Sequence, residues 1–408
     1  MSGTSAPLRF EAVAIPHSAA PARVQAPRLE IIEDLARAEP IWRRLERADL
    51  LATPYQRYDF MAPWQRTVGA SMGVTPFFVI GYDAADAPAF LWPLGRVKAG
   101  PLTIARFLGG KHANLNFALW RRDAAANTDA AMLRAILAQL ATAGTRVDLL
   151  QLFNQPESWE GVANPFATLT HQPSPSFAYR GRLSPDFNAL YEARTSSATR
   201  KKIRKKERTL AEHGPTRAFR AQTDDEAQRV LDAFFTQTAE RMREFGVCNV
   251  FAEPGVRDFI IEAATAGISE GKPALELYGL EVDGHIVATF GAVPGERRLS
   301  MMFTSITRGP LAQWSPGLLL LINLVRMACD REIPVVDLGV GEANYKDLFC
   351  DEPEPLFDSF IGLSAVGHLA AAASRLAYGV KGRVKRTPMI WQAVTAARRL
   401  RGKPSAAE

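Results

Sequence analysis

The residues best suited to chemistry stand close together in the last quarter of the chain. Asp337, Gly339, Gly341 and Glu342 lie at the carboxyl end of a predicted buried strand, and Lys346 follows them. Ligands of open α/β sheets gather at such strand ends. There, Asp337 or Glu342 can take a proton from an attacking amine or hydroxyl if burial moves its pKa toward neutrality, and Lys346 can stabilise a tetrahedral oxyanion. The alternative is a structural ion pair of Lys346 with one of these carboxylates, closing the sheet.

A second candidate element is the helix entry Ser315-Pro316-Gly317, which precedes an apolar helix predicted to run to Asp330. Proline suits the first turn of a helix, and glycine permits the close approach of a ligand. The free N–H groups and the dipole at such an end bind pyrophosphate readily. The entry therefore predicts an anion site at Ser315 and Gly317, with a plain helix cap as the alternative.

A basic helix is the third candidate. Residues 194–208 carry eight Lys or Arg and one Glu. Arg200, Lys201 and Lys202 fall in the first predicted turn, where positive charge opposes the helix dipole at a cost of roughly 0.3–1 kcal/mol each. This placement favours an anionic partner, and we expect Arg200, Lys201 and Arg204 to face it. A solvated helix face is the alternative. No helix-turn-helix or zinc-finger framework surrounds the segment, which argues against sequence-specific DNA reading.

The stretch at 107–117, FLGGKHANLNF, is the fourth candidate. It follows a predicted strand, so Lys111, His112 and Asn114 can hold the hydroxyl groups of an acceptor. A polar loop after a core strand is the alternative. The histidines form no cluster with Cys or Asp, so we expect no metal site, and the chain has no Walker loop or dinucleotide fingerprint.

The elements that position these residues follow one pattern twice. Each half is predicted as a strand, two helices, an antiparallel three-strand meander, a helix and a final strand. The meanders fall at 76–107 and 274–305, and the final strands at 147–153 and 335–339. Hydrophobic periodicity that alternates between the helical and the extended repeat indicates an α+β fold, here with two domains in tandem.

Three stretches together resemble a known family: FLGGKHANLNF, SSATRKKIRKKERTLAEHG and SPGLLLLINLVRMACDREIPVVDLGVGEANYKDLF. Over residues 50–365 the chain resembles the tandem-GNAT proteins grouped as CelD-like cellulose-biosynthesis acetyltransferases, distant relatives of the Fem-type peptidyltransferases. The resemblance implies two GNAT-like domains, each a mixed central sheet flanked by helices. It also implies acetyl-CoA as co-substrate, with its pyrophosphate at Ser315–Gly317, and an acceptor near Asp337–Lys346 that Tyr345 would contact.

The expected organisation divides the chain into four parts. These are a disordered lead-in at 1–27, a first domain at 28–182, a second domain at 183–365 with its acetyltransferase core at 195–350, and a basic tail at 366–408. The tail carries nine Lys or Arg and one Glu among apolar residues, so peripheral contact with an anionic membrane is one prediction and loose packing on the second domain the other. Three scattered cysteines and no recognisable leader favour a cytoplasmic protein.

The sequence thus predicts an acyltransferase that moves an acetyl or other acyl group from acyl-CoA to an amine or hydroxyl. The resemblance implies an acceptor in envelope or exopolysaccharide metabolism, and a saccharide-linked acceptor is one form of it. Two alternatives stay open. One is Fem-like aminoacyl transfer from tRNA, because several Lys and Arg on a short helix would also suit the phosphates of a tRNA. The other is a non-catalytic accessory protein at a membrane or a polysaccharide synthase.

Overall fold

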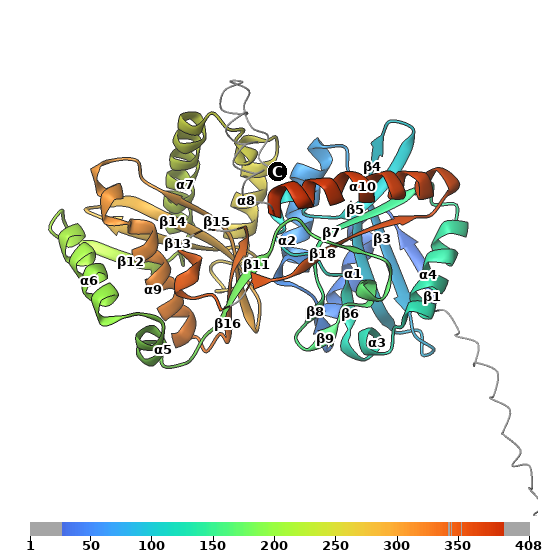
Figure 1. Cartoon of the computed structure of the whole chain (residues 1–408), viewed down its shortest axis with the longest axis horizontal. Coiled ribbons are helices and arrows are strands. Elements are labelled where there is room, and N and C mark those ends of the chain that lie inside the picture. The colour runs from blue at the N-terminus through green and yellow to red at the C-terminus, as the bar shows by residue number, and fades with distance from the viewer. Residues whose placement is uncertain (1–26, 342, 344, 352, 387–408) are drawn as a thin grey trace, which may run out of the picture.

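The computed structural model describes residues 27–341, 343, 345–351 and 353–386. Within this part of the chain, two large mixed sheets stand side by side, each covered by helices (Figure 1). The first has nine strands and runs β1-β3-β4-β5-β7-β18-β10, with β2 and β6 off this path. The second has seven described strands in the order β12-β13-β14-β15-β16-β11-β17. The predicted α+β class, with a mixed central sheet flanked by helices in each domain, is confirmed.

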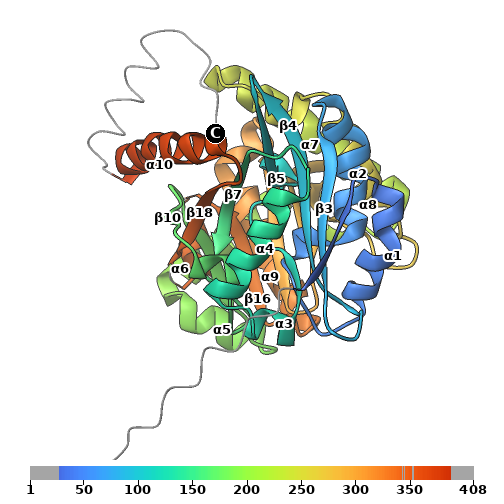
Figure 2. The same cartoon turned by 90° about the vertical axis from the view of Figure 1, so that its right-hand side faces the viewer.

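The first domain follows the predicted order with small additions. Its strands are β1 (Arg28–Ile32), β2 (Leu50–Leu51), β3 (Thr75–Tyr82), β4 (Pro88–Ala99), β5 (Leu102–Phe107), β6 (Leu119–Arg121), β7 (Leu149–Pro156) and β10 (Gln172–Pro173), with a separate hairpin of β8 (Ser158–Trp159) and β9 (Val162–Ala163). Its helices are α1 (Leu35–Glu46), α2 (Tyr58–Trp64), α3 (Arg122–Ala126) and α4 (Ala130–Thr142). Figure 2 shows α4 lying against this sheet.

The second domain contains strands β11 (Ala178–Arg182), β12 (Thr216–Arg220), β13 (Glu276–Val282), β14 (His285–Pro294), β15 (Arg298–Ile306), β16 (Val335–Val340) and β17 (Pro353–Glu354). Its helices are α5 (Phe187–Arg194), α6 (Ser197–Ala211), α7 (Asp224–Phe245), α8 (Val256–Thr265) and α9 (Pro316–Asp330). Local signals fix several of these limits. Thr223 Oγ1 accepts from the Glu226 amide at 3.2 Å, and Glu226 accepts from the Gln222 amide at 3.0 Å, so α7 begins with a reciprocal cap.

The two domains exchange strands, which the sequence pattern did not indicate. β18 (Leu356–Gly362), which falls within the limits expected for the second domain, pairs antiparallel with β7 of the first sheet. In return β11, on the first-domain side of the expected division at 182, pairs with β16 of the second sheet. Figure 1 shows both strands running between the two lobes. The expected limits 28–182 and 183–365 therefore do not coincide with the sheets, because strand pairing joins segments distant in the chain.

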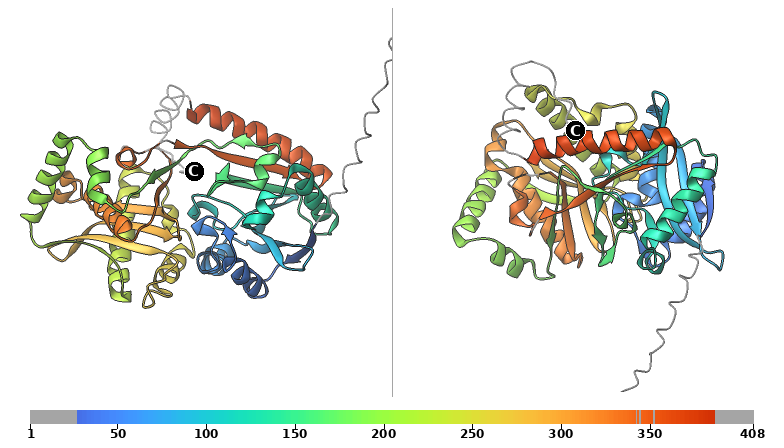
Figure 3. Two further views of the ribbon diagram at one scale, coloured as in Figure 1. Left: turned by 90° about the horizontal axis from the view of Figure 1, so that it is seen from below. Right: turned by 45° about the vertical axis from the view of Figure 1, so that its right-hand side comes forward.

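The expected basic tail begins as an ordered helix. α10 (Ala365–Arg386) packs on β18 and β7 of the first sheet, not loosely on the second domain (Figure 3). Residues 387–408 of that tail, and residues 1–26 of the expected lead-in, lie outside the described residues.

One apolar core runs through both domains. α7 and α8 cover the face of the second sheet that points toward the first domain, and their buried side chains join those of α1, α2 and β3 in a single cluster. Phe60 of α2 meets Phe259 of α8 edge to face at 5.1 Å between ring centroids. The opposite face of the second sheet has its own cluster under α5, α6 and α9. Because the first core is continuous, the two sheets form one packed body.

The pairing of β18 with β7 leads to a stability prediction. Phe360 of β18 is 1 % exposed and packs against Phe153 of β7 and Tyr378 of α10. We expect Phe360→Ala to lower the free energy of unfolding by about 3 kcal/mol, since a large side chain leaves a cavity. Hydrogen exchange then rises in β7 more than in β16. Greater loss of protection in β16 would contradict the exchange of strands.

Candidate active site in the second domain

The second sheet opens between its two parallel central strands. β15 and β16 pair only at their first three positions, from Arg298↔Val335 to Ser300↔Asp337. Beyond this point β15 remains paired with β14, where a bulge after Met301 shifts the register, while β16 continues along β11. Parallel strands that part in this way leave a wedge between them, at the end of the sheet where ligands of α/β folds bind.

The entry of α9 lies beyond the end of β15. Ser315 is the N-cap residue with φ of +56°, and it makes no side-chain cap bond to the helix. Pro316 has no N–H group, and the amides of Leu318 and Leu319 donate to the Ser315 carbonyl, so among the described residues the Gly317 amide is the first-turn donor left without a partner. A Cβ at position 317 would lie 2.7 Å from Cδ1 of Ile306 on β15, so the first turn of α9 packs closely on this side chain. The Gly317 amide and the dipole of α9 therefore remain available to an anion, and an anion site at Ser315 and Gly317 stays a prediction.

A cavity of about 1160 Å³ joins this helix entry to the basic helix α6. Its walls are apolar, with a cationic rim, and come from α6, α7, β14, β15, α9 and the loop after β16. The apolar lining includes Ile203, Phe245, Phe290, Ile306, Leu318 and Leu348. The charged lining residues are Arg194, Lys202, Lys206, Arg241, Arg308 and Asp347.

Three of the cations in this cavity have no carboxylate partner among the described residues. Arg194 pairs with Asp351 and Arg308 pairs with Glu244, so these two charges are compensated. Lys202, Lys206 and Arg241 form no such ion pair within the described part of the chain. Lys206 Nζ donates to Ser315 Oγ at 2.7 Å, which brings a positive charge to the N-terminus of α9. The cavity thus presents net positive charge beside a helix dipole of the same sign.

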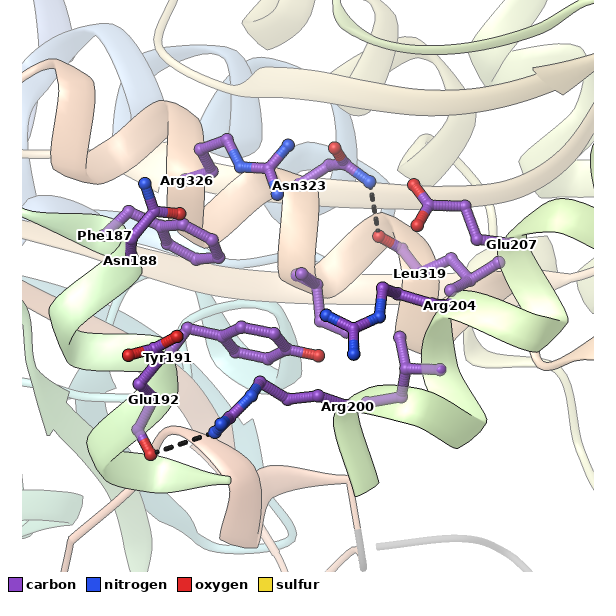
Figure 4. Close-up of a pocket in the computed structure, with 12 residues that line it drawn as sticks. Phe187, Asn188, Tyr191, Glu192, Arg200, Arg204, Glu207, Leu319, Asn323 and Arg326 are labelled. Carbon is purple, nitrogen blue, oxygen red and sulfur yellow. Dashed lines mark hydrogen bonds between the residues drawn. The ribbon is translucent and has the colours of Figure 1, made fainter. Parts of the chain in front are cut away.

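The cations of α6 point in three directions. Lys202 and Lys206, four residues apart, face the large cavity. Arg200 and Arg204 face a separate pocket of about 270 Å³ between α5, α6 and α9, which Figure 4 shows together with Tyr191 and Arg326. A third set, Lys201, Lys205 and Arg208, is exposed and lines neither space.

The residues predicted to hold the cofactor thus differ from those the structure brings to the cavity. Ser315 and Gly317 line it, but Arg200, Lys201 and Arg204 do not. Arg200 Nη1 instead donates to the carbonyl oxygens of Thr195 and Glu192. The signal that sequence reasoning missed is the helical position of Ile203, which is buried and therefore fixes the inward face of α6. Lys202 and Lys206 flank that face at a spacing of one turn.

Asp337 lies behind the cavity wall. Its side chain is fully buried and does not line the cavity. One carboxylate oxygen accepts from the Gly339 amide at 2.8 Å, and the other accepts from Ser300 Oγ at 3.3 Å and lies 3.7 Å from Arg298. These contacts hold the strand end where β15 and β16 part.

Lys346 is also buried and turns away from the cavity. Its ammonium group donates to the carbonyl oxygens of Gly339 at 3.0 Å and Gly341 at 2.7 Å, and it lies over the ring of Tyr179. Gly339 and Gly341 have φ of +76° and +96°, so the chain turns sharply and presents both carbonyls to one cation. Burial lowers the pKa of Lys346 to about 8. Asp337 pairs with Arg298, and not with Lys346 as the structural alternative proposed; Glu342 lies outside the described residues.

Tyr345, expected to contact the acceptor, does line the cavity. Its side chain is half-buried. Burial is the main cause that raises the pKa of its hydroxyl, and the nearby Cys350 raises this pKa further. The phenol therefore stays protonated at neutral pH. Asp347 is the carboxylate that lines the same cavity among the described residues.

The first-domain residues expected to hold an acceptor instead join the two domains. Lys111 pairs with Glu253 at 3.5 Å, and Asn114 Nδ2 donates to the Met301 carbonyl at 2.9 Å. His112 is buried against the rings of Phe251 and Phe259. Its Nδ1 accepts from the indole of Trp64 at 3.1 Å, and burial lowers the pKa of His112 to about 4. These contacts between the domains favour the alternative prediction for this stretch, a polar loop after a core strand.

The first domain also has a parted pair of parallel strands but a closed helix entry. β5 and β7 pair only at Ile104↔Leu149 and Ala105↔Leu150. The helix before β7, α4, begins with Asp129, whose carboxylate accepts from the Met132 amide at 2.8 Å. A negative group already occupies this helix N-terminus, so it repels a phosphate. Anion binding at a central helix therefore favours the second domain.

Residues 197–347 match the family model described as "Acetyltransferase (GNAT) domain". The second domain has the GNAT fold. No curated protein matches the chain.

Among solved structures, FemX is similar over 81 % of this chain and 96 % of its own, with 9 % identity and a TM-score of 0.54. The C-terminal domain of a putative lysylphosphatidylglycerol synthetase from Agrobacterium fabrum covers 84 % of this chain and 96 % of its own at 10 % identity, with a TM-score of 0.48. A tandem GNAT protein of clavulanic acid biosynthesis covers 83 % and 99 % at 14 % identity, with a TM-score of 0.42. The similarity to FemX shows that the fold extends over both domains. Membership of the CelD-like group stays a prediction.

The described residues show two further features relevant to function. No group of His, Cys, Asp or Glu among them is arranged to hold a metal ion. None of the helices formed by them has the length and apolarity to cross a membrane.

The position of Lys346 leads to a pH prediction. Its pKa falls from 10.5 to about 8 on folding, so between these values the unfolded chain binds a proton that the folded chain does not. Parental stability therefore rises with pH in this window relative to Lys346→Met. We expect the unfolding free energy of the parent minus that of Lys346→Met to increase by up to about 3 kcal/mol across this pH window, measured by urea denaturation. A difference that is independent of pH would show that the buried ammonium keeps its ordinary affinity for protons.

Proposed function

We propose that the second domain transfers an acyl group from acyl-CoA, with acetyl-CoA as the donor, to an amine or hydroxyl acceptor. The observation that carries this proposal is one cavity shared by the N-terminus of α9, the end of β15, the loop after β16 and two lysines of α6. The GNAT model matched by this domain supports the same reaction class.

The donor's charges suit the cationic part of the cavity. The pyrophosphate of coenzyme A would accept a hydrogen bond from the Gly317 amide at the start of α9, and Lys202, Lys206 and Arg241 would supply the counter-charges. Phosphate replaces water around cations that have no carboxylate partner among the described residues, so little existing stabilisation is lost. The volume of about 1160 Å³ exceeds the range of roughly 300–1,000 Å³ typical of small-ligand sites, as a cofactor of this size requires. Phe290, Ile306 and Leu318 would contact the pantetheine arm and the acyl group.

The reaction needs one nucleophile and two proton transfers. The acceptor nitrogen or oxygen attacks the thioester carbonyl, the C–S bond breaks, and coenzyme A leaves as a thiolate. We assign the protonation of this thiolate to Tyr345, because its hydroxyl is protonated at neutral pH and its side chain lines the cavity. Asp347 can receive the acceptor's proton. Asp337 and Lys346, which we expected to be catalytic, would act as positioning residues at the parting of the strands.

The acceptor is proposed from the resemblance alone. A saccharide-linked amine or hydroxyl of envelope or exopolysaccharide metabolism fits the CelD-like pattern, and a cytoplasmic location fits an acyl-CoA donor. A second candidate function has one observation in its favour. The exposed stripe of Lys201, Lys205 and Arg208 on α6 lies outside the cavity and would suit the phosphates of a tRNA in Fem-like aminoacyl transfer.

Four lysines of α6 provide a test with a matched control. The variant Lys202→Gln/Lys206→Gln removes two charges from the cavity, and Lys201→Gln/Lys205→Gln removes two from the exposed stripe of the same helix. Charge-assisted hydrogen bonds contribute about 1.5–3 kcal/mol each, so we expect the cavity variant to bind acetyl-CoA roughly 100-fold more weakly. The stripe variant should bind as the parent does, measured by isothermal titration calorimetry.

The same pair of variants separates the two functions. Equal affinities of parent and cavity variant, or no binding by the parent, would overturn the proposed donor site. Aminoacyl-tRNA binding that weakens in the stripe variant and not in the cavity variant would favour the second candidate. Each variant changes the net charge equally, so a general electrostatic effect cannot produce opposite outcomes.

The role of Tyr345 can be tested by deleting one oxygen. We expect Tyr345→Phe to lower kcat about 100-fold with little change in the affinity for acetyl-CoA, as for the loss of a general acid. Thiol release from acetyl-CoA with a panel of amino sugars provides the measurement. Tyr191→Phe, in the small pocket on the other side of α6, serves as the control. An unchanged kcat in Tyr345→Phe would remove the assignment.

A further inference from the structure

The inner face of α10 is fixed on the first domain. Ala371 is 1 % exposed, and the ring of Tyr378 lies 5.2 Å from the ring centroids of both Phe153 and Phe360. Arg375 donates to the Phe360 carbonyl at 2.7 Å. A Cβ at Gly367 would lie 1.8 Å from the Asp148 carbonyl oxygen, so the first turn rests directly on the strand. α10 is therefore held in one orientation, with a defined face outward.

That outward face is apolar. Val366, Leu369, Leu376 and Val380 are 54 %, 74 %, 73 % and 60 % exposed. They account for four of the seven large hydrophobic side chains that are exposed among the described residues. Spacings of three, seven and four residues keep them within an arc of about 80° on a helix of 3.6 residues per turn. A soluble helix face normally carries polar residues here, so this stripe indicates a contact surface.

The charges around the stripe are all of one sign. Residues 365–386 include five Lys or Arg and no acid. At 100° per residue, Lys381 and Arg383 fall on opposite sides of the apolar stripe. Residues 387–408 add four basic residues and one Glu to the same end of the chain.

We propose that the outer face of α10 docks on an anionic lipid bilayer, with the helix lying flat on the surface. An apolar stripe flanked by basic residues is the pattern of an interfacial helix, in which the apolar side chains enter the headgroup region and the cations meet acidic lipids. This surface contact needs no helix that crosses the membrane. It is also separate from the donor cavity, because α10 packs on the first sheet.

Charge favours a bilayer over a second copy of the chain. A second copy of α10 carries no acid that could pair with the basic residues of the first. An anionic lipid surface offers the opposite charge along the whole helix. Each lipid contact would thus combine apolar burial with ionic attraction.

Co-sedimentation of the full chain with lipid vesicles tests the proposal. We expect binding to vesicles of phosphatidylglycerol and phosphatidylcholine, and little binding to phosphatidylcholine alone. The variant Leu369→Gln/Leu376→Gln keeps the charge and should lower the vesicle affinity at least about tenfold. Met72→Gln is the control, because Met72 is 58 % exposed and lies far from α10 in the chain. Acetyl-CoA affinity should be unchanged in all variants, which separates this test from that of the donor site.

Three results would overturn the proposal. The first is equal sedimentation of the parent and the Leu369→Gln/Leu376→Gln variant. The second is equal binding to neutral and anionic vesicles, which would leave the basic residues without a role. The third is a dimer in sedimentation velocity that this variant dissociates, together with no binding to vesicles, which would identify a second copy as the occupant.

Discussion

The parting of β15 and β16 is the constraint on which the rest of the second domain depends. Strands that separate expose backbone groups, and buried backbone groups need partners. The Met301 carbonyl accepts from Tyr55 and Asn114 of the first domain, and the Gly339 carbonyl accepts from Lys346. The Gly339 amide donates to Asp337. Asp337, Lys346 and Asn114, whose residue types suggested catalytic or binding groups, thus supply hydrogen-bond partners to the opened sheet.

The first domain supports this opening without sharing its chemistry. Its loop after β5 supplies Asn114 and the buried His112, and its core is continuous with that of α7 and α8. The exchange of β11 and β18 adds backbone pairing in both directions. A cavity formed only by the second domain therefore rests on a wall that the first domain holds in place. Asp129 at the start of α4 shows how one carboxylate closes the corresponding helix entry in the other half.

The helix α6 shows how a run of charge is divided by rotation along a helix. Successive residues are rotated by 100° about the helix axis, so the side chains of neighbours in the sequence point in different directions. Lys202 and Lys206 reach the entry of α9, while Arg200 and Arg204 reach the pocket beside Tyr191. The charge density of the segment predicts an anionic partner, and that partner remains a proposal. Which cations meet that partner depends on Ile203, whose burial sets the rotation of the helix.

The sequence alone determined the order and limits of the main elements, because hydrophobic periodicity, the cap at Thr223 and the entry at Pro316 are local signals. It also led to the prediction of an anion site at Ser315 and Gly317, since a helix N-terminus carries its own dipole. Tertiary structure decided the rest. β18 joins the first sheet, Lys206 meets Ser315 across 109 residues, and Asp337 turns from the cavity toward Arg298. Strand pairing and side-chain burial depend on segments that are distant in the chain, so no local pattern encodes them.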